Sequence, residues 1–366
     1  MALVSGIGRD GGVQDVRGVL FGLAAAVLYA SIVLTNKKLT RTDGISRTIL
    51  QLLTAGASFR RPTPGQLIRE GAAAARIHAD LLGDGRVIDQ ACDVTPRKRS
   101  FSHNGKTCKA AYMPRTLMSV LFNPDDLALV KRGASQRRDE IDAFGRQASA
   151  NYGNLLAAYQ RTVEQRNRLL KDPYPDLALL DAWDASLAVG GAALLSARAK
   201  LYCRLADKMV PIYREIADGE ELGTAYVSAL GDVVGVDRSE LECRLADAIA
   251  AGRAEDLRRQ QTCVGPHRDD LAFSVRGRDA RAYGSQGQQR TVVLAWKMAE
   301  VEVAHDVLGD KPLLLLDDVM SELDGARRSA VVGFVGQGIQ TVITTTNLGY
   351  FDEGLLAAAK VVDFGE

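Results

Sequence analysis

Two adjacent carboxylates follow an unbroken apolar run near the end of the chain. Four leucines at 313–316 come after Pro312, and Asp317 and Asp318 end the run. A short run that is apolar on both faces is typical of a buried strand in a parallel sheet. Ligands of such sheets bind beyond the carboxyl ends of the strands, and carboxylate oxygens suit Mg²⁺ with nucleotide phosphates. The pair therefore favours a magnesium–nucleotide site, and the alternative is a core strand capped by a solvated acidic turn.

The same residues fit the Walker B pattern of phosphate-loop ATPases. In that pattern Asp317 holds the metal side, and Asp318 orients or deprotonates the attacking water. A small, polar loop at 284–291 lies upstream and opens a predicted helix at 292–305. Backbone N–H groups at a helix start form an anion site, although the loop alone fits an ordinary helix entry equally well.

The order of these motifs resembles that of ABC-type ATPases, in which such a loop caps the γ-phosphate bound by the other subunit. The resemblance implies an ATP-contacting loop made of Ser285, Gln286, Gly287 and Gln288. It also places Asp324 in the loop that meets the dimer mate. Thr345 or Thr346, at the end of a β-branched run, would replace the histidine that senses the γ-phosphate.

A longer set of motifs resembles the RecF family of DNA replication and repair proteins. They lie at 52–60, 120–127, 165–171, 264–271, 285–290 and 315–324, so the resemblance covers about residues 50–366. It implies an α/β fold, an ABC/SMC-like ATPase head with an inserted helical lobe. It also implies ATP and Mg²⁺ as cofactors, an ATP-dependent homodimer and a cytoplasmic location. The expected partners are single-stranded or gapped DNA and recombination mediator proteins, in recombinase loading and the SOS response.

One family motif is missing from the sequence. The phosphate loop, Gly-x-x-x-x-Gly-Lys-Ser/Thr, belongs just upstream of residue 52, but residues 36–44 contain no such pattern. Gly105-Lys106-Thr107 offers a partial match, but Ser100 stands in place of the first glycine. Asn104-Gly105 instead predicts a hairpin turn. We therefore expect impaired ATP binding, and the alternative is a non-enzymatic DNA- or partner-binding relic.

The N-terminal segment offers an explanation for this loss. Residues 18–34 carry no charge and are flanked by Arg17 and by Lys37-Lys38. This stretch resembles one helix of an EamA-like drug/metabolite transporter, and its length is at the short end for a membrane span. We expect residues 1–45 to be foreign sequence that replaces the first strands and the phosphate loop, as in a chimeric reading frame. A buried helix and a membrane-tethered head are the alternatives, and a membrane partner is not expected.

Hydrophobic periodicity divides the rest of the chain into three parts. Residues 46–115 form the N-terminal part of the head, with strand-like runs at 73–82 and 86–94. Residues 116–255 form the helical lobe, with amphipathic helices at 152–170 and 185–217 separated by a proline-containing turn. Residues 256–366 return to the α/β core.

The overall charge gives no nucleic-acid signal, because the net charge is +1 and the pI is about 7.6. Basic residues nevertheless cluster locally, and no acidic residue occurs from 95 to 124. Such clusters could neutralise DNA phosphates, and the alternative is a solvated charged surface. The candidates are Arg97, Lys98, Arg99, Lys131, Arg132, Arg137 and Arg138. The five scattered cysteines predict reduced thiols rather than disulfides or a zinc site.

Overall fold

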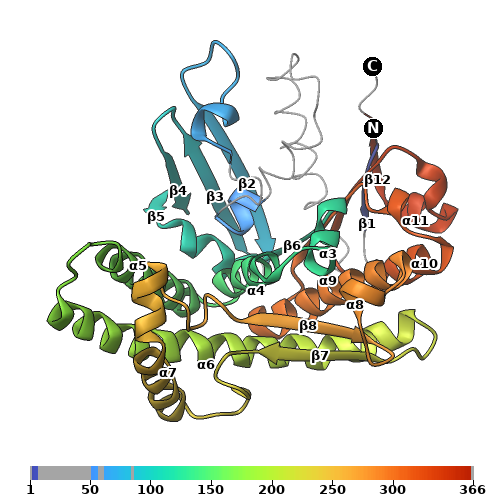
Figure 1. The fold of residues 1–366 in the computed structure, drawn as a ribbon. Coiled ribbons are helices and arrows are strands. Elements are labelled where there is room, and N and C mark those ends of the chain that lie inside the picture. Colours follow the sequence, from blue (N-terminus) through green and yellow to red (C-terminus); the bar gives the residue numbers. More distant parts are fainter. Residues whose placement is uncertain (1, 7–50, 57–61, 84–85, 364–366) are drawn as a thin grey trace. The chain divides into compact units, whose positions relative to one another are not determined.

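The computed structural model describes residues 2–6, 51–56, 62–83 and 86–363 (Figure 1). These residues form two compact units, the first from the described parts of 1–126 and 304–366 and the second from 127–303. Residues 256–303, expected with the C-terminal part of the head, therefore group with the helices. The predicted hydrophobic segment at 18–34 and the position of the absent phosphate loop at 36–44 lie outside the described residues.

The first unit contains a five-stranded sheet in the order β12-β1-β11-β10-β6. Strand β10 (Leu313–Asp317) lies between β6 (Ser119–Phe122) and β11 (Thr341–Thr345) and runs parallel to both. Every residue of β10 is buried, which confirms the predicted parallel strand covered on both faces. The turn η4 (Met320–Glu322) and helix α10 (Gly325–Val335) follow β10.

The other edge of this sheet has a different strand direction. Strand β1 (Ala2–Gly6) lies antiparallel to both β11 and β12 (Lys360–Asp363). Its register places Ala2 opposite Thr345 and Gly6 opposite Thr341. The chain therefore leaves β1 at the amino-terminal end of β11, whereas β10 ends in its carboxylate at the opposite end. Helix α11 (Glu353–Ala358) packs beside β1 and β12, and the short turn η5 (Leu348–Tyr350) precedes it (Figure 1).

A separate four-stranded antiparallel sheet belongs to the same unit. It consists of β2 (Ala75–Gly83), β3 (Arg86–Val94), β4 (Arg99–His103) and β5 (Lys106–Cys108). One face packs on a core with the helical residues Leu52 and Leu53. Asn104 and Gly105 join β4 to β5 with φ of 48° and 72°, which confirms the hairpin turn. Lys106 is thus the first residue of a strand rather than part of a phosphate loop. Short turns at η1 (Pro64–Leu67), η2 (Ala110–Arg115) and η3 (Pro124–Leu127) complete this part of the unit.

The second unit is built mainly from helices. Its elements are α3 (Ala128–Lys131), α4 (Ala134–Ala148), α5 (Ala150–Leu170), α6 (Leu177–Ile216), α7 (Arg238–Arg259), α8 (Ala280–Tyr283), β7 (Leu222–Val227), β8 (Asp270–Val275), β9 (Arg278–Asp279) and most of α9 (Gln286–Leu308). The predicted helices on either side of the proline-containing turn are confirmed as α5 and α6. Helix α6 begins earlier than expected because the Asp176 carboxylate accepts hydrogen bonds from the N–H groups of Ala178 and Leu179. Among the described helices, α6 alone has the length and apolar composition that could cross a membrane, and core helices of globular proteins share both properties.

Candidate nucleotide site and basic surface

The carboxylate of Asp317 is held at the end of β10 by the neighbouring strand. Asp317 is 3 % exposed, and the Thr344 hydroxyl donates a hydrogen bond of 2.7 Å to its Oδ1. The parallel register of β10 and β11 places these two residues side by side. A fixed, buried carboxylate at a strand end is a ready ligand for a hard cation. The sequence did not single out Thr344, because its position beside Asp317 depends on the register of the two strands.

Asp318 adopts an unusual backbone conformation directly after the strand. Its φ is 49°, in the left-handed region, which aspartate enters more readily than most residues. Its N–H donates to the carbonyl and hydroxyl oxygens of Thr344, at 3.0 and 3.2 Å. Among the described residues, its buried Oδ1 atom has no hydrogen-bond partner. A buried carboxylate oxygen without a partner requires a cation, a proton or a water.

The two carboxylates together fit Mg²⁺. They supply hard oxygen atoms at the carboxyl end of a parallel strand, where Mg²⁺ is bound by one or two carboxylates plus phosphate oxygens. Asp317 would contribute to binding the metal. Asp318, whose free oxygen is available, would orient a water. The metal would supply charge neutralisation for the phosphates.

The remaining candidates in the first unit have local roles in the structure. Asp324 is the N-cap of α10, where its carboxylate accepts from the Arg327 N–H at 3.0 Å and pairs with the Arg327 guanidinium. The pKa of Asp324 is lowered, first of all by that backbone hydrogen bond. Thr345 is buried and exchanges hydrogen bonds with the backbone of Asn347, whereas Thr346 is exposed. Thr344, rather than Thr345 or Thr346, contacts the acidic pair.

The candidate phosphate-contacting loop opens α9 in the second unit. The Ser285 N–H donates to the Gln288 side-chain oxygen at 2.9 Å, and the Gln288 N–H donates to the Ser285 hydroxyl at 3.2 Å. This reciprocal arrangement is a capping box, a helix-start device that the Ser-x-x-Gln spacing encodes. The Gln288 amide also donates to Glu220 at 2.8 Å. Gln286 and Gly287 begin the helix itself. The two sets of candidates thus belong to different units.

The shared hydroxyl of Thr344 gives a first testable prediction. Thr344→Val keeps the shape of the side chain but removes the hydrogen bonds that its hydroxyl makes with Asp317 and Asp318. Loss of a partner to a buried polar group costs about 1–3 kcal/mol, so we expect a loss of that size in the free energy of unfolding. Urea denaturation measures it. Thr346→Val, at an exposed site, is the matched control and should change stability by less than about 0.5 kcal/mol. Equal losses in both variants would contradict the argument.

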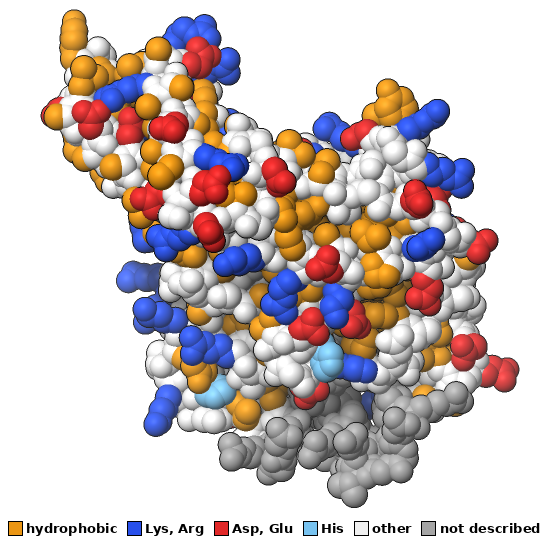
Figure 2. Space-filling view, turned by 90° about the horizontal axis from the view of Figure 1, so that it is seen from below, with side chains coloured by type: hydrophobic (Ala, Val, Ile, Leu, Met, Phe, Trp, Pro, Cys, Tyr) orange, Lys and Arg blue, Asp and Glu red, His pale blue; other side chains and the backbone are white. Residues whose placement is uncertain are grey.

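The candidate DNA-binding residues differ in how exposed their side chains are to solvent. Arg97, Lys98, Lys131 and Arg132 are exposed. Arg99 donates to the carbonyl oxygen of Pro62. Figure 2 shows that lysine and arginine side chains on the face drawn are interspersed with acidic ones, in agreement with the net charge of +1. Any electrostatic attraction of DNA therefore comes from local groups rather than from the charge of the whole chain.

Arg137 and Arg138 donate hydrogen bonds within the protein, so fewer of their donors are available to DNA phosphates than the sequence suggested. The Arg137 guanidinium is buried and forms two hydrogen bonds to the Asp270 carboxylate, at 2.6 and 2.8 Å. Arg138 donates to the Asp269 carbonyl oxygen at 2.5 Å. Burial, followed by the positive charge of Arg198, lowers the pKa of Arg138. Sequence reasoning missed these pairs because the partners lie more than 130 residues apart.

His267, in the motif at 264–271, is part of the packing of the second unit. One ring nitrogen accepts from the Tyr159 hydroxyl at 2.7 Å, and the other donates to the Thr262 carbonyl oxygen at 3.0 Å. This arrangement requires a neutral ring. Burial, and then the charges of Arg268, Arg138 and Arg198, lower the pKa of His267 to about 4, although the Thr262 carbonyl opposes the shift.

This shift predicts a pH dependence of stability. The pKa of His267 is about 4 in the folded state against 6.5 for an unperturbed histidine. Between these two values the unfolded chain binds a proton that the folded chain does not, so stability is complete above 6.5 and falls as the pH drops toward 4. From pH 7 to pH 5 this group should cost about 2 kcal/mol. His267→Gln, which removes the titrating group, should lose less stability over that interval in urea denaturation. An identical pH dependence in both proteins would count against the assignment.

A buried parallel strand that ends in Asp317, in a unit whose sequence is interrupted by a largely helical unit, is the α/β arrangement that the sequence predicts for an ABC/SMC-like ATPase head. No family model matches the chain. It is 41 % identical over 309 residues to the DNA replication and repair protein RecF of Symbiobacterium thermophilum, covering 82 % of this chain and 81 % of that protein. The corresponding protein of Heliobacterium modesticaldum is 37 % identical over 319 residues, covering 85 % of each. The chain belongs to the RecF family of DNA replication and repair proteins.

Solved structures agree with this assignment. A structure of the recombination mediator protein RecF-ATPrS in the RecFOR pathway superimposes with a TM-score of 0.78 at 28 % identity, covering 85 % of both chains. A structure of RecF-ATP in the same pathway gives a TM-score of 0.74 at 29 % identity, covering 82 % of both chains.

Proposed function

We propose that this chain is a DNA-binding head of the DNA repair and replication machinery in the cytoplasm, with impaired binding of ATP. The observation that carries the proposal is the arrangement of Asp317 and Asp318 around Thr344, with one carboxylate oxygen free for a cation or a water. The related RecF structures are described with ATPrS or ATP, which supports ATP as the ligand. Mg²⁺ bound by the acidic pair and a homodimer formed around ATP belong to the same proposal. Recombination mediator proteins are the expected partners, and recombinase loading in the SOS response is the expected setting.

The direction of β1 supports the proposed impairment of ATP binding. A phosphate loop follows a strand whose carboxyl end lies beside the acidic pair. Strand β1 is antiparallel to β11, so its end at Gly6 lies opposite Thr341, away from the strand end that carries Asp317. The sequence offers no Gly-x-x-x-x-Gly-Lys-Ser/Thr pattern elsewhere.

DNA binding would use the exposed basic residues. Arg97 and Lys98 lie in the turn between β3 and β4, and Lys131 and Arg132 lie at the end of α3. Each lysine or arginine that neutralises a duplex phosphate adds about 0.9 to the dependence of log affinity on log salt. The double variant Arg97→Ala/Lys98→Ala should therefore weaken binding to gapped DNA and reduce that slope by about 2. Arg258→Ala removes an exposed arginine paired with Glu255 and is the control.

The experiment that tests the function combines DNA binding with nucleotide turnover. We expect gapped DNA to bind with a steep salt dependence, and any residual DNA-stimulated ATP hydrolysis to disappear in Asp318→Asn. If the affinity for DNA does not change with the concentration of ATP–Mg²⁺ and no hydrolysis is measurable, the chain is the non-enzymatic relic instead. Absence of DNA binding at about 50 mM salt, where phosphate contacts are strong, would overturn the proposal.

A further inference from the structure

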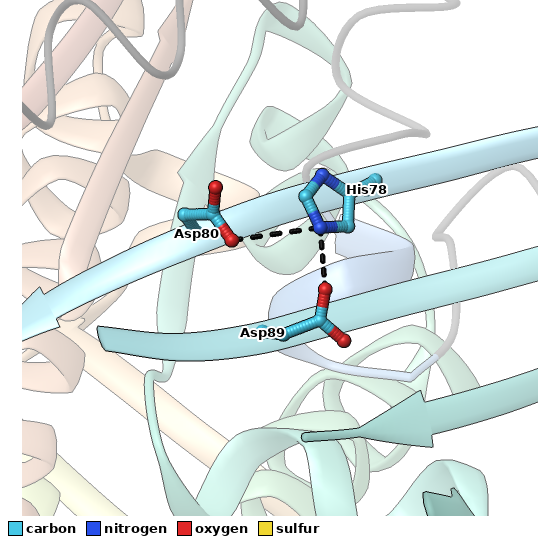
Figure 3. A group of neighbouring side chains, drawn as sticks. All are labelled: His78, Asp80 and Asp89. Atoms are coloured by element: carbon cyan, nitrogen blue, oxygen red, sulfur yellow. Dashed lines mark hydrogen bonds and ion pairs between the residues drawn. The ribbon is translucent and has the colours of Figure 1, made fainter. Parts of the chain in front are cut away.

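Three side chains with metal-binding atoms share one face of the four-stranded sheet (Figure 3). His78 and Asp80 are two residues apart on β2, so they point to the same side of the strand. Asp89 on β3 lies directly opposite Asp80 in the antiparallel register. The alternate residues Ile77, Ala79 and Leu81 point into the buried core on the other face. Two paired strands anchored on a core thus fix the backbone positions of all three ligands.

The charges of this group are unbalanced. Asp80 and Asp89 are like charges directly opposite one another, an arrangement that destabilises an antiparallel pair. Within the described part of the chain, their one ion-pair partner is His78, which carries a charge only when protonated. Farther along the same face, the carboxylate of Asp93 has the permanent charge of Arg76 opposite it at 3.6 Å. A divalent cation would supply for Asp80 and Asp89 what Arg76 supplies for Asp93.

The distances suit a small metal ion. The His78 Nε2 atom lies 3.5 Å from Asp80 Oδ1 and within hydrogen-bonding distance of Asp89 Oδ2, and the three ligand atoms lie within 4.8 Å of one another. Two donors on a tetrahedral ion with bonds of about 2.0 Å are separated by about 3.3 Å. The cluster therefore needs only small side-chain rotations to close around an ion. All three side chains are partly exposed, so the outward coordination positions are open to water or to an added ligand.

We propose that His78, Asp80 and Asp89 bind one divalent transition-metal ion, such as Zn²⁺, Co²⁺ or Mn²⁺. The imidazole nitrogen favours these ions over Mg²⁺ and Ca²⁺, which take oxygen ligands. Three protein ligands with open positions are the arrangement of an accessible metal site rather than of a closed structural one. This site shares no residue with the acidic pair Asp317 and Asp318. A test of metal binding at this site is therefore independent of the ATPase assignment.

The test is a metal titration of the full, untagged chain after chelation and dialysis. We expect one equivalent of Zn²⁺ by calorimetry, and Co²⁺ absorption in the visible range that Zn²⁺ displaces. His78→Ala and Asp89→Asn should each raise the dissociation constant at least tenfold, and circular dichroism should show an unchanged fold. His103→Ala, which removes another histidine of the same sheet, should bind as the unmodified chain does. Absence of saturable binding below about 1 mM, a free energy of about 4 kcal/mol, would overturn the proposal. The proposal would also be wrong if His78→Ala and Asp89→Asn bound the metal as tightly as the unmodified chain does.

Discussion

Replacing Arg166 by alanine is expected to lower the free energy of unfolding by about 3–5 kcal/mol, the cost of breaking a buried ion pair. Arg166 lies on α5 and is fully buried. Its guanidinium donates to the carboxylates of Asp184 and Asp256, at 2.6 and 2.7 Å, and to the Thr262 hydroxyl at 3.0 Å. These contacts join α5 to α6, α7 and the segment before β8. The truncation would leave the buried Asp256 carboxylate without this cation, and burial of an uncompensated charge is what makes the loss large.

Urea denaturation of the full chain measures this effect. Arg168→Ala provides the matched control, because Arg168 lies two residues away on the same helix and is exposed. It should change stability by less than about 0.5 kcal/mol. The double variant Arg166→Met/Asp256→Leu removes both charges and should recover part of the loss, because an apolar pair of similar volume avoids the desolvation penalty. A loss below about 1 kcal/mol in Arg166→Ala would show that Arg166 is dispensable for the packing of these helices.

Local patterns were sufficient to predict much of this fold. The leucine run before Asp317 predicted the buried strand, Asn104-Gly105 predicted the hairpin turn, and the apolar spacing at 152–170 predicted α5. Each of these elements depends on residues that are neighbours in the sequence. The resemblance to the RecF family supplied the expected order of the elements, and homologues and related structures confirm the family itself.

Features that depend on distant residues could not be predicted in this way. Arg137 is paired with a carboxylate 133 residues away. The cluster of basic residues in the sequence therefore gave no sign that its guanidinium has an internal partner. Thr344 contacts Asp317 because two parallel strands are in register, and the register is not visible in either strand alone. The Ser285–Gln288 capping box has a recognisable spacing, but the same residues also resemble a phosphate-contacting loop. The sequence alone does not distinguish the two.

The largest expected effect concerns ATP affinity. Each hydrogen bond to a charged phosphate is worth about 1.5–3 kcal/mol, so losing several backbone donors and a lysine should cost on the order of 5 kcal/mol or more. At about 1.4 kcal/mol per factor of ten, this chain should bind ATP–Mg²⁺ about a thousandfold or more weakly than a RecF protein with an intact phosphate loop. The acidic pair of β10 cannot compensate, because carboxylates reach the phosphates only through a metal ion. Calorimetric titration of this chain with ATP–Mg²⁺, beside a relative that carries the Gly-x-x-x-x-Gly-Lys-Ser/Thr motif, measures the ratio.

Two variants test which residues contact ATP–Mg²⁺ if the measured affinity is higher than expected. Lys106→Ala should leave ATP affinity unchanged, because Lys106 begins strand β5 after a hairpin turn. If it weakens binding, the partial Gly105-Lys106-Thr107 match contacts phosphate after all. Asp317→Asn should weaken whatever affinity remains, since that carboxylate is the proposed metal ligand. Affinity within tenfold of the motif-bearing relative would mean that other residues of this chain supply the phosphate contacts. The impairment would then be wrong, although the family assignment would stand, because it rests on similarity along most of the chain.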